Sequence, residues 1–398
     1  MSDDTVKRSG PLAGLRVLDL SRVLAGPWST QILGDLGAEV IKIEQPGQGD
    51  DTRRWGPPFL EDGSRDAAYY LCANRNKQSV AINLADPRGA EIIREIAAQC
   101  DIVVENFRVG GLVKYGLDYA SLSASKPELI YCSITGFGQD GPYASLAGYD
   151  YIVQGMSGFM SITGEPDGQP MKSGVAIADI FTGIYSVTAI QSALIHVMKT
   201  GEGQHIDMAL LDVMSAVLAN QNMNYLISGI SPVRLGNAHP NISPYEVINV
   251  QDGYIILAVG NDGQFRRFCR ILGIEHVADD ERFSTNKARV AHRIEVRSLL
   301  IAETIKWTKA DLLSACGDNA VPVGPINSIG EMFEDPQVKA RGLRVDLEAA
   351  DGTVIPGVRS PIVLSETPLA YHRPSPNVGE HTAEILAELN MIEKERNR

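Results

Sequence analysis

The sequence has few cysteines and histidines, and their spacing excludes two classes of site. The five cysteines among 398 residues are widely scattered and show no CxxC spacing. This pattern indicates reduced thiols rather than a disulfide framework or a zinc site. The seven histidines form no HxH or HExxH pair. We therefore expect no metal site.

Long uncharged apolar runs and an excess of basic residues are also missing. The apolar stretches are interrupted by Asp, Gln, His or Lys, so no membrane span is expected. The first fourteen residues lack the apolar stretch of a secretory signal, and a cytoplasmic location is expected. The net charge of −13 argues against binding to nucleic acid or to an anionic membrane. It leaves room for a local basic pocket, and a small anionic metabolite is the expected partner.

The first half of the chain alternates apolar strands with helices. Residues 15–21 and 38–44 read as strands on either side of a helix at 27–37, which is a βαβ unit. The alternation continues with strands at 79–83, 101–107 and 129–135. A chain of this length and pattern predicts an open parallel α/β sheet, together with a second, smaller domain.

A nicotinamide dehydrogenase is the alternative that this pattern leaves open. Glu44 lies about where an acidic residue meets the ribose of a dinucleotide. The turn after the first strand, however, reads "RVLAGPW" and contains no GxGxxG. Without those glycines the backbone cannot approach a pyrophosphate closely, which makes this a minor alternative.

The composition changes after residue 225. Residues 228–250 are rich in Pro, Asn and Gly and have little helical periodicity, so we expect a linker near a domain boundary. Two strands around the Asp-Gly of "YEVINVQDGYIILAVG" follow, and then several helical segments. This part of the sequence predicts a smaller α+β module.

A single carboxylate, Asp179, lies within the small and apolar residues of "GVAIADIFTG". Directly after it comes a helical segment expected at 180–199. An Asp in this place reads most simply as an N-cap, whose side chain accepts backbone N–H bonds.

Several phrases together carry a family resemblance. They are "PLAGLRVLDLSRVLAGPWSTQILGDLGAEVIKIEQPGQGD", "NRNKQSVAINL", "VVENFRVG", "GFGQDGPYASLAGYDYIVQGMSG", "GVAIADIFTG" and "GEGQHIDMALLD". The sequence resembles the class III CoA-transferases, which include formyl-CoA transferase, carnitine CoA-transferase and the α-methylacyl-CoA racemases. The likeness runs from about residue 11 to 390 in the same order. The run "RLGNAHPNISPYEVINVQDGYIILAVGND" looks most like the succinyl-CoA–dicarboxylate transferases, including the glutarate enzyme.

The resemblance implies a fold and an assembly. The expected large domain is Rossmann-like and is built from both chain ends, residues 1–225 and 331–398. Residues 226–330 would form the linker and the small α+β domain. Two chains would interlock as a homodimer.

The resemblance also implies a reaction at Asp179. A carboxylate at the family's nucleophile position attacks an acyl-CoA thioester, giving a mixed anhydride and then an aspartyl-CoA thioester. A second carboxylic acid takes over the CoA. CoA thioesters are thus substrates, and no permanently bound cofactor is expected. A helix N-terminus among small residues suits this role as well as it suits a cap.

A set of residues is expected to bind CoA by the same resemblance: Leu24, Ala25, Gln45, Ile82, Leu84, Asn106, Phe107, Arg108, Lys114, Tyr149 and Asp150. Two of them depart from formyl-CoA transferase, which has arginine at the positions of Gln45 and Lys114. Arg75, Lys77 or Arg88 would then compensate for the lost charge.

The substrates are the least constrained part of the prediction. The racemases carry histidine where this chain has Tyr149, and a tyrosine of ordinary pKa is a poor base at neutral pH. We therefore favour a transferase over a racemase. The resemblance to the succinyl-CoA–dicarboxylate transferases implies transfer from succinyl-CoA to a dicarboxylate, for which Arg53, Arg54 and His239 are candidate carboxylate ligands. Two alternatives stay open, a racemase and a CoA-binding protein without activity.

Overall fold

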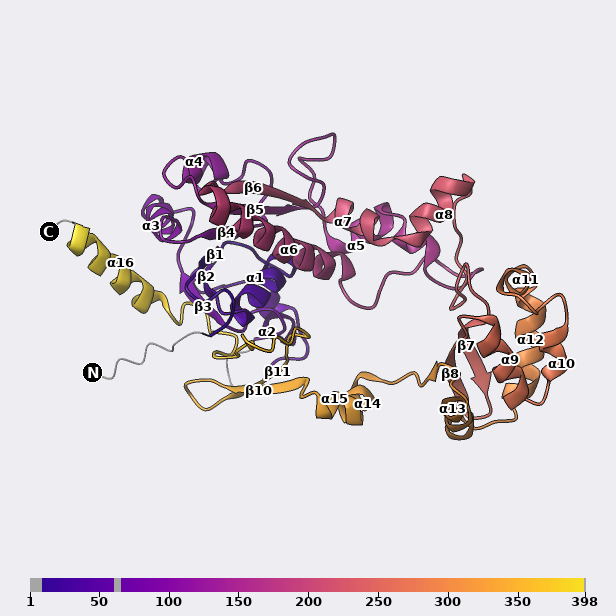
Figure 1. The fold of residues 1–398 in the computed structure, drawn as a ribbon. Coiled ribbons are helices and arrows are strands. Elements are labelled where there is room, and N and C mark those ends of the chain that lie inside the picture. Colours follow the sequence, from indigo (N-terminus) through magenta and orange to yellow (C-terminus); the bar gives the residue numbers. More distant parts are fainter. Residues whose placement is uncertain (1–8, 61–65, 397–398) are drawn as a thin grey trace. The chain divides into compact units, whose positions relative to one another are not determined.

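The computed structural model describes residues 9–60 and 66–396, so part of the segment searched for a secretory signal lies outside it. The chain divides into two compact units, which we describe separately (Figure 1). Unit 1 contains Met1–Phe159, Lys172–Asn222 and Lys339–Arg398. Unit 2 contains Met160–Met171 and Met223–Val338.

Unit 1 is built on a six-stranded sheet in the order β3-β2-β1-β4-β5-β6, with every neighbouring pair parallel. The strands are β1 (Arg16–Asp19), β2 (Glu39–Glu44), β3 (Lys77–Ala81), β4 (Ile102–Glu105), β5 (Ile130–Thr135) and β6 (Gln204–Ala209). The open parallel α/β sheet predicted from the sequence is confirmed. Because the strand order reverses between β1 and β4, a crevice is expected beyond the carboxyl ends of these two strands.

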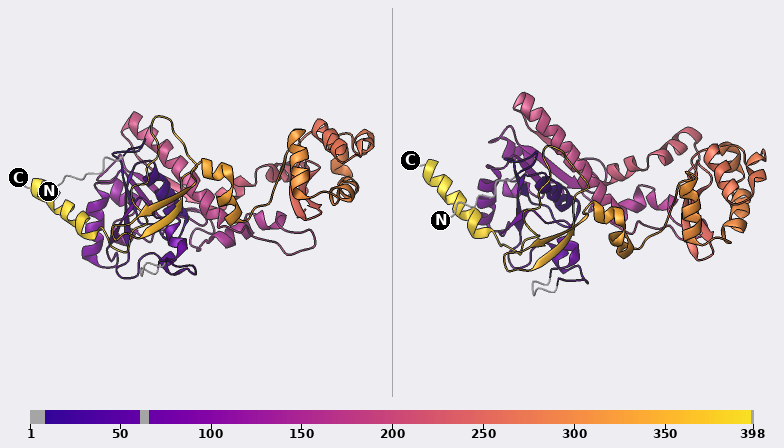
Figure 2. Two further views of the ribbon diagram at one scale, coloured as in Figure 1. Left: turned by 90° about the horizontal axis from the view of Figure 1, so that it is seen from below. Right: turned by 60° about the horizontal axis from the view of Figure 1, so that its bottom comes forward.

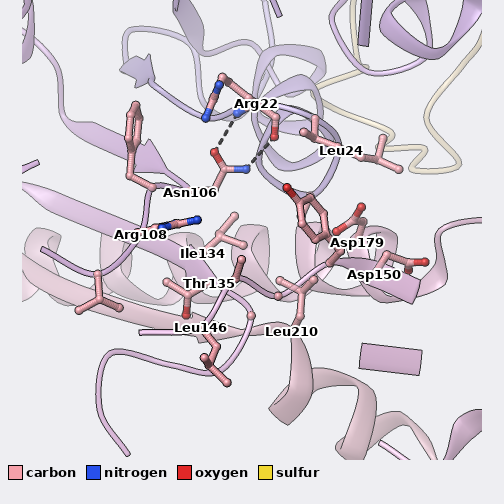
Figure 3. Close-up of a pocket in the computed structure, with 18 of the residues that line it drawn as sticks. Arg22, Leu24, Asn106, Arg108, Ile134, Thr135, Leu146, Asp150, Asp179 and Leu210 are labelled. Atoms are coloured by element: carbon pink, nitrogen blue, oxygen red, sulfur yellow. Dashed lines mark hydrogen bonds between the residues drawn. The ribbon is translucent and has the colours of Figure 1, made fainter. Parts of the chain in front are cut away.

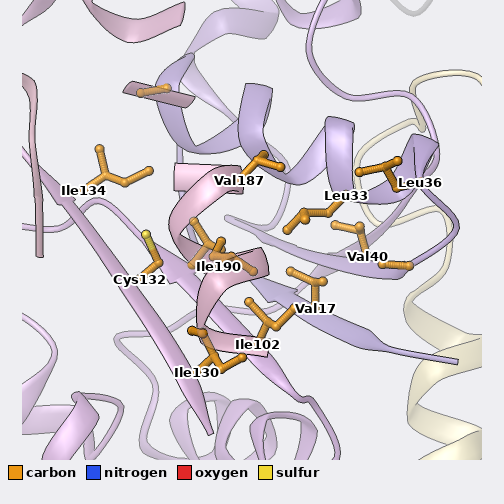
Figure 4. Close-up of a cluster of buried hydrophobic side chains, with 14 of the residues drawn as sticks. Val17, Leu33, Leu36, Val40, Ile102, Ile130, Cys132, Ile134, Val187 and Ile190 are labelled. Atoms are coloured by element: carbon orange, nitrogen blue, oxygen red, sulfur yellow. The ribbon is translucent and has the colours of Figure 1, made fainter. Parts of the chain in front are cut away.

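Helices cover both faces of this sheet, as its apolar strands require. On one face, Leu33 of α1 and Val187 and Ile190 of α6 pack on Val17 and the neighbouring strands (Figure 4). The opposite face packs against α3, α4 and α16. The helices of unit 1 are α1 (Ala25–Asp35), α2 (Ala68–Leu71), α3 (Pro87–Ala97), α4 (Tyr119–Ser123), α5 (Asp150–Met156), α6 (Ile177–Thr200), α7 (Leu210–Val217) and α16 (Thr382–Arg396).

Helix α6 differs from the sequence prediction in two respects. It begins at Ile177 with Ala176 as its N-cap, so Asp179 is the third helical residue and the N-cap interpretation is wrong. An 18-residue window within the 24 residues of α6 also reaches a mean hydropathy of 1.4, enough by length and composition to span a membrane, contrary to our expectation. Its packing on α1 and the sheet is that of a core helix of an α/β unit.

The C-terminal segment returns to the sheet of unit 1 (Figure 2). The hairpin of β10 (Arg344–Glu348) and β11 (Val354–Val358) precedes it. The amide of His381 donates to the carbonyl of Ser79, and the hydroxyl of Thr382 accepts a bond of 2.9 Å from the Ala81 amide. Both ends of the chain therefore build the large α/β unit, as the resemblance implied.

Unit 2 is an α+β module, which confirms the predicted class. Its antiparallel sheet has the order β7-β8-β9, and β7 and β8 flank a turn at Gln251 and Asp252. Phe265, Phe268 and Leu300 lie in its core. Its strands are β7 (Tyr245–Val250), β8 (Gly253–Ala258) and β9 (Val323–Gly324). The helices are α9 (Asp262–Ile271), α10 (Glu275–Asp279), α11 (Asn286–Ala291), α12 (Arg293–Thr304), α13 (Lys309–Asp318) and α14 (Ile329–Glu334), and α8 (Asn220–Ser228) and α15 (Pro336–Ala340) extend across the unit boundaries.

Candidate active site

A cavity of about 520 Å³ lies within unit 1, beyond the carboxyl ends of β1, β4 and β5. The loops that follow these strands line it with Arg22 to Ala25, Asn106 to Val109, and Gly136. Asp179 lines it from the first turn of α6. This is the crevice expected for a ligand in an open parallel sheet.

The Asp179 carboxylate is held in a state that favours protonation. Burial, and then the negative charge of Asp150, raise the pKa of Asp179 to about 7. None of the described residues donates a hydrogen bond to this carboxylate. At neutral pH a large fraction is ionised, unshielded and facing the cavity, which is the condition for a carboxylate nucleophile.

Asp150 is the first residue of α5 and fixes the start of α6. One of its carboxylate oxygens accepts the Ala178 amide at 2.8 Å, and the other accepts the side-chain amide of Gln154 at 2.7 Å. The carbonyl oxygen of that Gln154 side chain accepts the Ser173 amide at 2.8 Å. Asp150 therefore sets both the position and the electrostatic environment of Asp179 (Figure 3).

Close backbone contacts at two glycine positions bring the walls of the cavity together. A Cβ on Gly136 would lie 2.4 Å from the Cα of Gly148, so no side chain fits between β5 and the segment that leads to Asp150. A Cβ on Gly183 would lie 2.8 Å from the carbonyl oxygen of Ala25. Gly183 thus lets α1 approach α6 one turn after Asp179.

The Asn106 side chain forms two hydrogen bonds with the backbone of Arg22, in the loop after β1. Its oxygen accepts the Arg22 amide at 2.9 Å, and its amide donates to the Arg22 carbonyl at 2.7 Å (Figure 3). Asn106 therefore orders this loop through the backbone of Arg22.

A second cavity of about 300 Å³ adjoins the first and contains three more of the predicted residues, Gln45, Ile82 and Leu84. The two cavities share Arg22, Asp51 and Phe107. The predicted residues that line the first cavity are Leu24, Ala25, Asn106, Phe107, Arg108, Tyr149, Asp150 and Asp179.

Other predicted residues lie outside these cavities. Lys114 is exposed, with its ammonium 4.7 Å from the centroid of the Tyr115 ring. Arg54 forms an ion pair of 3.2 Å with Asp51, and His239 belongs to unit 2.

Arg53, a candidate ligand for a substrate carboxylate, and the compensating residues Arg75, Lys77 and Arg88 are mostly engaged in the core. The buried guanidinium of Arg53 donates to Glu44, Asp66, Tyr70 and the Pro376 carbonyl. Arg75 pairs with Asp35 at 2.6 Å, and Lys77 with Asp19 at 3.1 Å, both out of solvent. Arg88 is exposed and pairs with Glu91 at 2.7 Å. Held in these interactions, Arg53, Arg75 and Lys77 do not line either cavity.

Three residues at the site escaped the sequence analysis. Arg22 lines both cavities, and Trp55 lines the first. The rings of Tyr69 and Trp55 meet edge to face, with their centroids 5.4 Å apart. Burial, and then the negative charge of Asp179, raise the pKa of Tyr69 to about 12. Trp55 and Tyr69 lie on either side of a loop, so no periodicity marks them. The only available signal for Arg22 was its place directly after the first strand.

Known proteins resemble this chain over almost its whole length. The model of CoA-transferase family III matches residues 12–382. A succinate–glutarate CoA-transferase from Agrobacterium fabrum is 69% identical over 98% of this chain and 98% of its own length. The human succinyl-CoA:glutarate CoA-transferase is 43% identical over 95% of this chain and 86% of its own. The crystal structure of a CAIB/BAIF family protein from Brucella suis, 56% identical, covers 96% of this chain and 100% of that one with a TM-score of 0.86.

Proposed function

The chain belongs to CoA-transferase family III, and we propose that it transfers CoA from succinyl-CoA to a small dicarboxylate with Asp179 as the nucleophile. The observation that carries the proposal is the position of Asp179, a partly ionised carboxylate on the wall of a cavity beyond the parallel sheet. The names of the relatives, which are succinate–glutarate and succinyl-CoA:glutarate CoA-transferases, support the choice of substrates.

The first half-reaction moves CoA from the succinyl group to the Asp179 carboxylate and releases succinate. The Asp179 carboxylate attacks the thioester carbonyl of succinyl-CoA, and the C–S bond breaks to release CoA thiolate and leave a mixed anhydride. The thiolate then attacks the Asp179 acyl carbon of this anhydride. Succinate leaves, and Asp179 carries CoA as a thioester.

The second half-reaction repeats these steps in reverse order with the acceptor. A carboxylate of the acceptor attacks the Asp179 thioester, giving a new anhydride and free CoA thiolate. The thiolate attacks the acceptor's acyl carbon, so the new acyl-CoA leaves and the Asp179 carboxylate is regenerated. No net proton is taken up or released, and ping-pong kinetics are expected.

CoA would occupy both cavities. The thioester would lie by Asp179 in the first, and the nucleotide would extend past Arg22 and Phe107 into the second, near Gln45, Ile82 and Leu84. Arg22 and Arg108 offer positive charge for the phosphates. They also offer it for the distal carboxylate of a succinyl group. Lys114, Arg54 and His239 lie outside both cavities. Lys114 stays a prediction as a CoA ligand, and Arg54 and His239 stay predictions as ligands of the substrate carboxylate.

We also propose that the active species is a homodimer. Large apolar side chains on α8 and directly after it are strongly exposed to solvent: Leu226 is 70% exposed, Ile227 80% and Ile230 74%. Apolar side chains gathered in this way mark a surface that another protein covers. The resemblance supplies the occupant, a second copy of the chain.

The test is acyl exchange by Asp179→Ala. We expect the folded variant to lose exchange between succinyl-CoA and glutarate while keeping its affinity for CoA. Hydroxylamine added to the wild type after succinyl-CoA should mark Asp179 in a mass spectrum. Turnover by the folded variant would remove Asp179 from this role. Exchange of the α-hydrogen with deuterated water, without any acceptor, would instead establish a racemase.

A further inference from the structure

Two lysines are fully buried at the base of the loop that lines the Asp179 cavity. Lys42 of β2 and Lys77 of β3 have no exposed side-chain surface, and neither do the carboxylates of Asp19 and Asp50. Buried charges of this kind are rare because removing them from water is costly. None of the steps proposed at Asp179 uses them.

Lys42 and Asp50 hold the loop at two points. The Lys42 ammonium donates to the carbonyl of Ser21 at 2.8 Å and pairs with Asp50 at 3.0 Å. Both oxygens of Asp50 accept the amide of Val23 at 3.3 Å. The ion pair therefore bonds to the residues on both sides of Arg22, whose own backbone is bonded to Asn106.

Asp19 and Lys77 hold the same loop from its other side. Asp19 accepts the amide of Ser21 at 2.9 Å, and Lys77 donates to the carbonyl of Pro27, in the first turn of α1, at 2.9 Å. Asp19 and Lys77 are joined by an ion pair of 3.1 Å. Opposite charges thus surround the loop from the end of β1 to the start of α1.

The loop needs this support because of the conformation of Val23. Its φ is 72°, in the left-handed region that β-branched residues avoid, so the backbone is strained there. Strain of this kind persists only where surrounding bonds over-determine the conformation. The Lys42–Asp50 pair supplies such a bond directly to the Val23 amide.

Lys42 keeps its charge in spite of its burial. Burial acts to lower the pKa of Lys42, but the carboxylates of Asp50, Asp19 and Glu44 outweigh it and raise this pKa above its ordinary value. These three carboxylates, together with Lys77 beside Asp19, are the charged groups around the Lys42 ammonium. Lys42 in turn lowers the pKa of Asp50, so both members of the Lys42–Asp50 pair are charged at neutral pH.

We propose that Lys42 is a positioning residue for CoA transfer: with Asp50 it holds Ser21 and Val23 so that Arg22, Leu24 and Ala25 face Asp179. This inference rests on the proposed function. It assigns a role in turnover to an ion pair that lies in the wall of the second cavity but has no exposed side-chain surface with which to contact CoA. A displacement of the loop by about 1 Å would misplace the thioester relative to the Asp179 carboxylate, at a cost on the order of 100-fold in rate.

The test compares Lys42→Met with Arg16→Met in the full-length protein. Arg16 pairs with Glu39 and Glu388 at the opposite end of β1, so its loss also removes a partly buried cation from the sheet. We expect Lys42→Met to lower kcat about 100-fold, with the Kd for free CoA within about threefold of wild type. Arg16→Met should lower Tm but leave kcat within about threefold.

A second substitution examines the strain itself. Glycine adopts a positive φ without penalty, so Val23→Gly added to Lys42→Met should restore at least about tenfold of the lost kcat. If Lys42→Met does not fold, Lys42→Gln, which keeps an N–H donor but has no charge, replaces it in both comparisons.

Three outcomes would overturn the inference. They are an unchanged kcat in the folded Lys42 variant, an equal loss of kcat in Arg16→Met, and no recovery with Val23→Gly. In each case a wild type that still exchanges CoA between succinyl-CoA and glutarate leaves the proposed function intact. A wild type without this exchange would overturn the proposed function first.

Discussion

The Asp150 carboxylate accepts a hydrogen bond of 2.8 Å from the amide of Ala178, the residue directly before Asp179. One carboxylate therefore fixes the helix end that carries the other, and its charge adds to the effect of burial on the pKa of Asp179. Geometry and reactivity at Asp179 are coupled through Asp150. The two effects can be separated, because an asparagine keeps the acceptor oxygen and removes the charge.

The first prediction concerns pH. Burial and Asp150 raise the pKa of Asp179 to about 7, and only the ionised carboxylate attacks a thioester. We expect kcat/KM for succinyl-CoA to fall about tenfold per pH unit below that value. Asp150→Asn should move this acidic limb to lower pH, with the Ala178 bond retained. A limb that stays in place in the variant would show that Asp150 does not influence Asp179 electrostatically.

A second prediction links the proposed nucleophile, Asp179, to the stability of the protein. The pKa of Asp179 is about 7 in the folded protein against an ordinary value of 3.8, so the folded state binds this proton more tightly than the unfolded state does. Stability from this group is therefore lost as pH rises from about 4 to about 7. Asp179→Asn, which cannot ionise, should have a higher Tm than wild type at pH 8 and nearly the same Tm at pH 4. Equal differences at both pH values would contradict a raised pKa.

The third prediction uses the close approach of α1 and α6. Gly183→Ala would place a Cβ 2.8 Å from the Ala25 carbonyl oxygen, which must move together with its helix. We expect a loss of about 1–3 kcal/mol in the free energy of unfolding and about 100-fold in kcat. Gly317→Ala in α13 is the matched control, since its added Cβ would meet no atom within 4 Å. Thermal unfolding and steady-state kinetics measure both effects. Equal losses of stability and of kcat in the two variants would count against a role for the close approach of α1 and α6.

The fourth prediction concerns the homodimer. Ile227 is 80% exposed, and a glutamate in its place would put a charge into the proposed interface. Sedimentation velocity at micromolar concentration should give a dimer for the wild type and a larger monomer fraction for Ile227→Glu. Lys199→Glu, at the C-terminal end of α6 in unit 1, provides a control for added negative charge. A folded wild-type monomer at this concentration would exclude the dimer as the stable species.

The sequence predicted the sheet of unit 1 well because its strands are short apolar runs separated by turn residues. The strand expected at 38–44 is β2, Glu39–Glu44. The start of α6 was missed by three residues, since a carboxylate before an apolar segment is as typical of an N-cap as of the first helical turn. The position of Asp179 in the cavity required the family resemblance.

The buried charges were beyond sequence reasoning. A lysine in a strand, such as Lys42, is most often exposed, and Lys77 was expected to be available to phosphates. Their burial depends on carboxylates that reach them from β1 and from the turn after β2. Ion pairs between residues that are distant in the sequence produce no periodic pattern of residue types from which they could be predicted. The same holds for Asn106, whose bonds to Arg22 join the ends of two strands far apart in the sequence.

The return of the C-terminal segment to β3 also governs the order in which the protein can form during synthesis. Unit 2 consists mainly of the continuous stretch Met223–Val338, which leaves the ribosome before the residues that complete unit 1. Until Ser79 meets the His381 amide, one face of the nascent sheet lacks α16, with its apolar Ile385 and Leu389. Nascent chains would then expose the part of that face that Ile385 and Leu389 cover in the finished fold until the C-terminal segment has been synthesised, and exposed apolar surface of this kind promotes aggregation of folding intermediates.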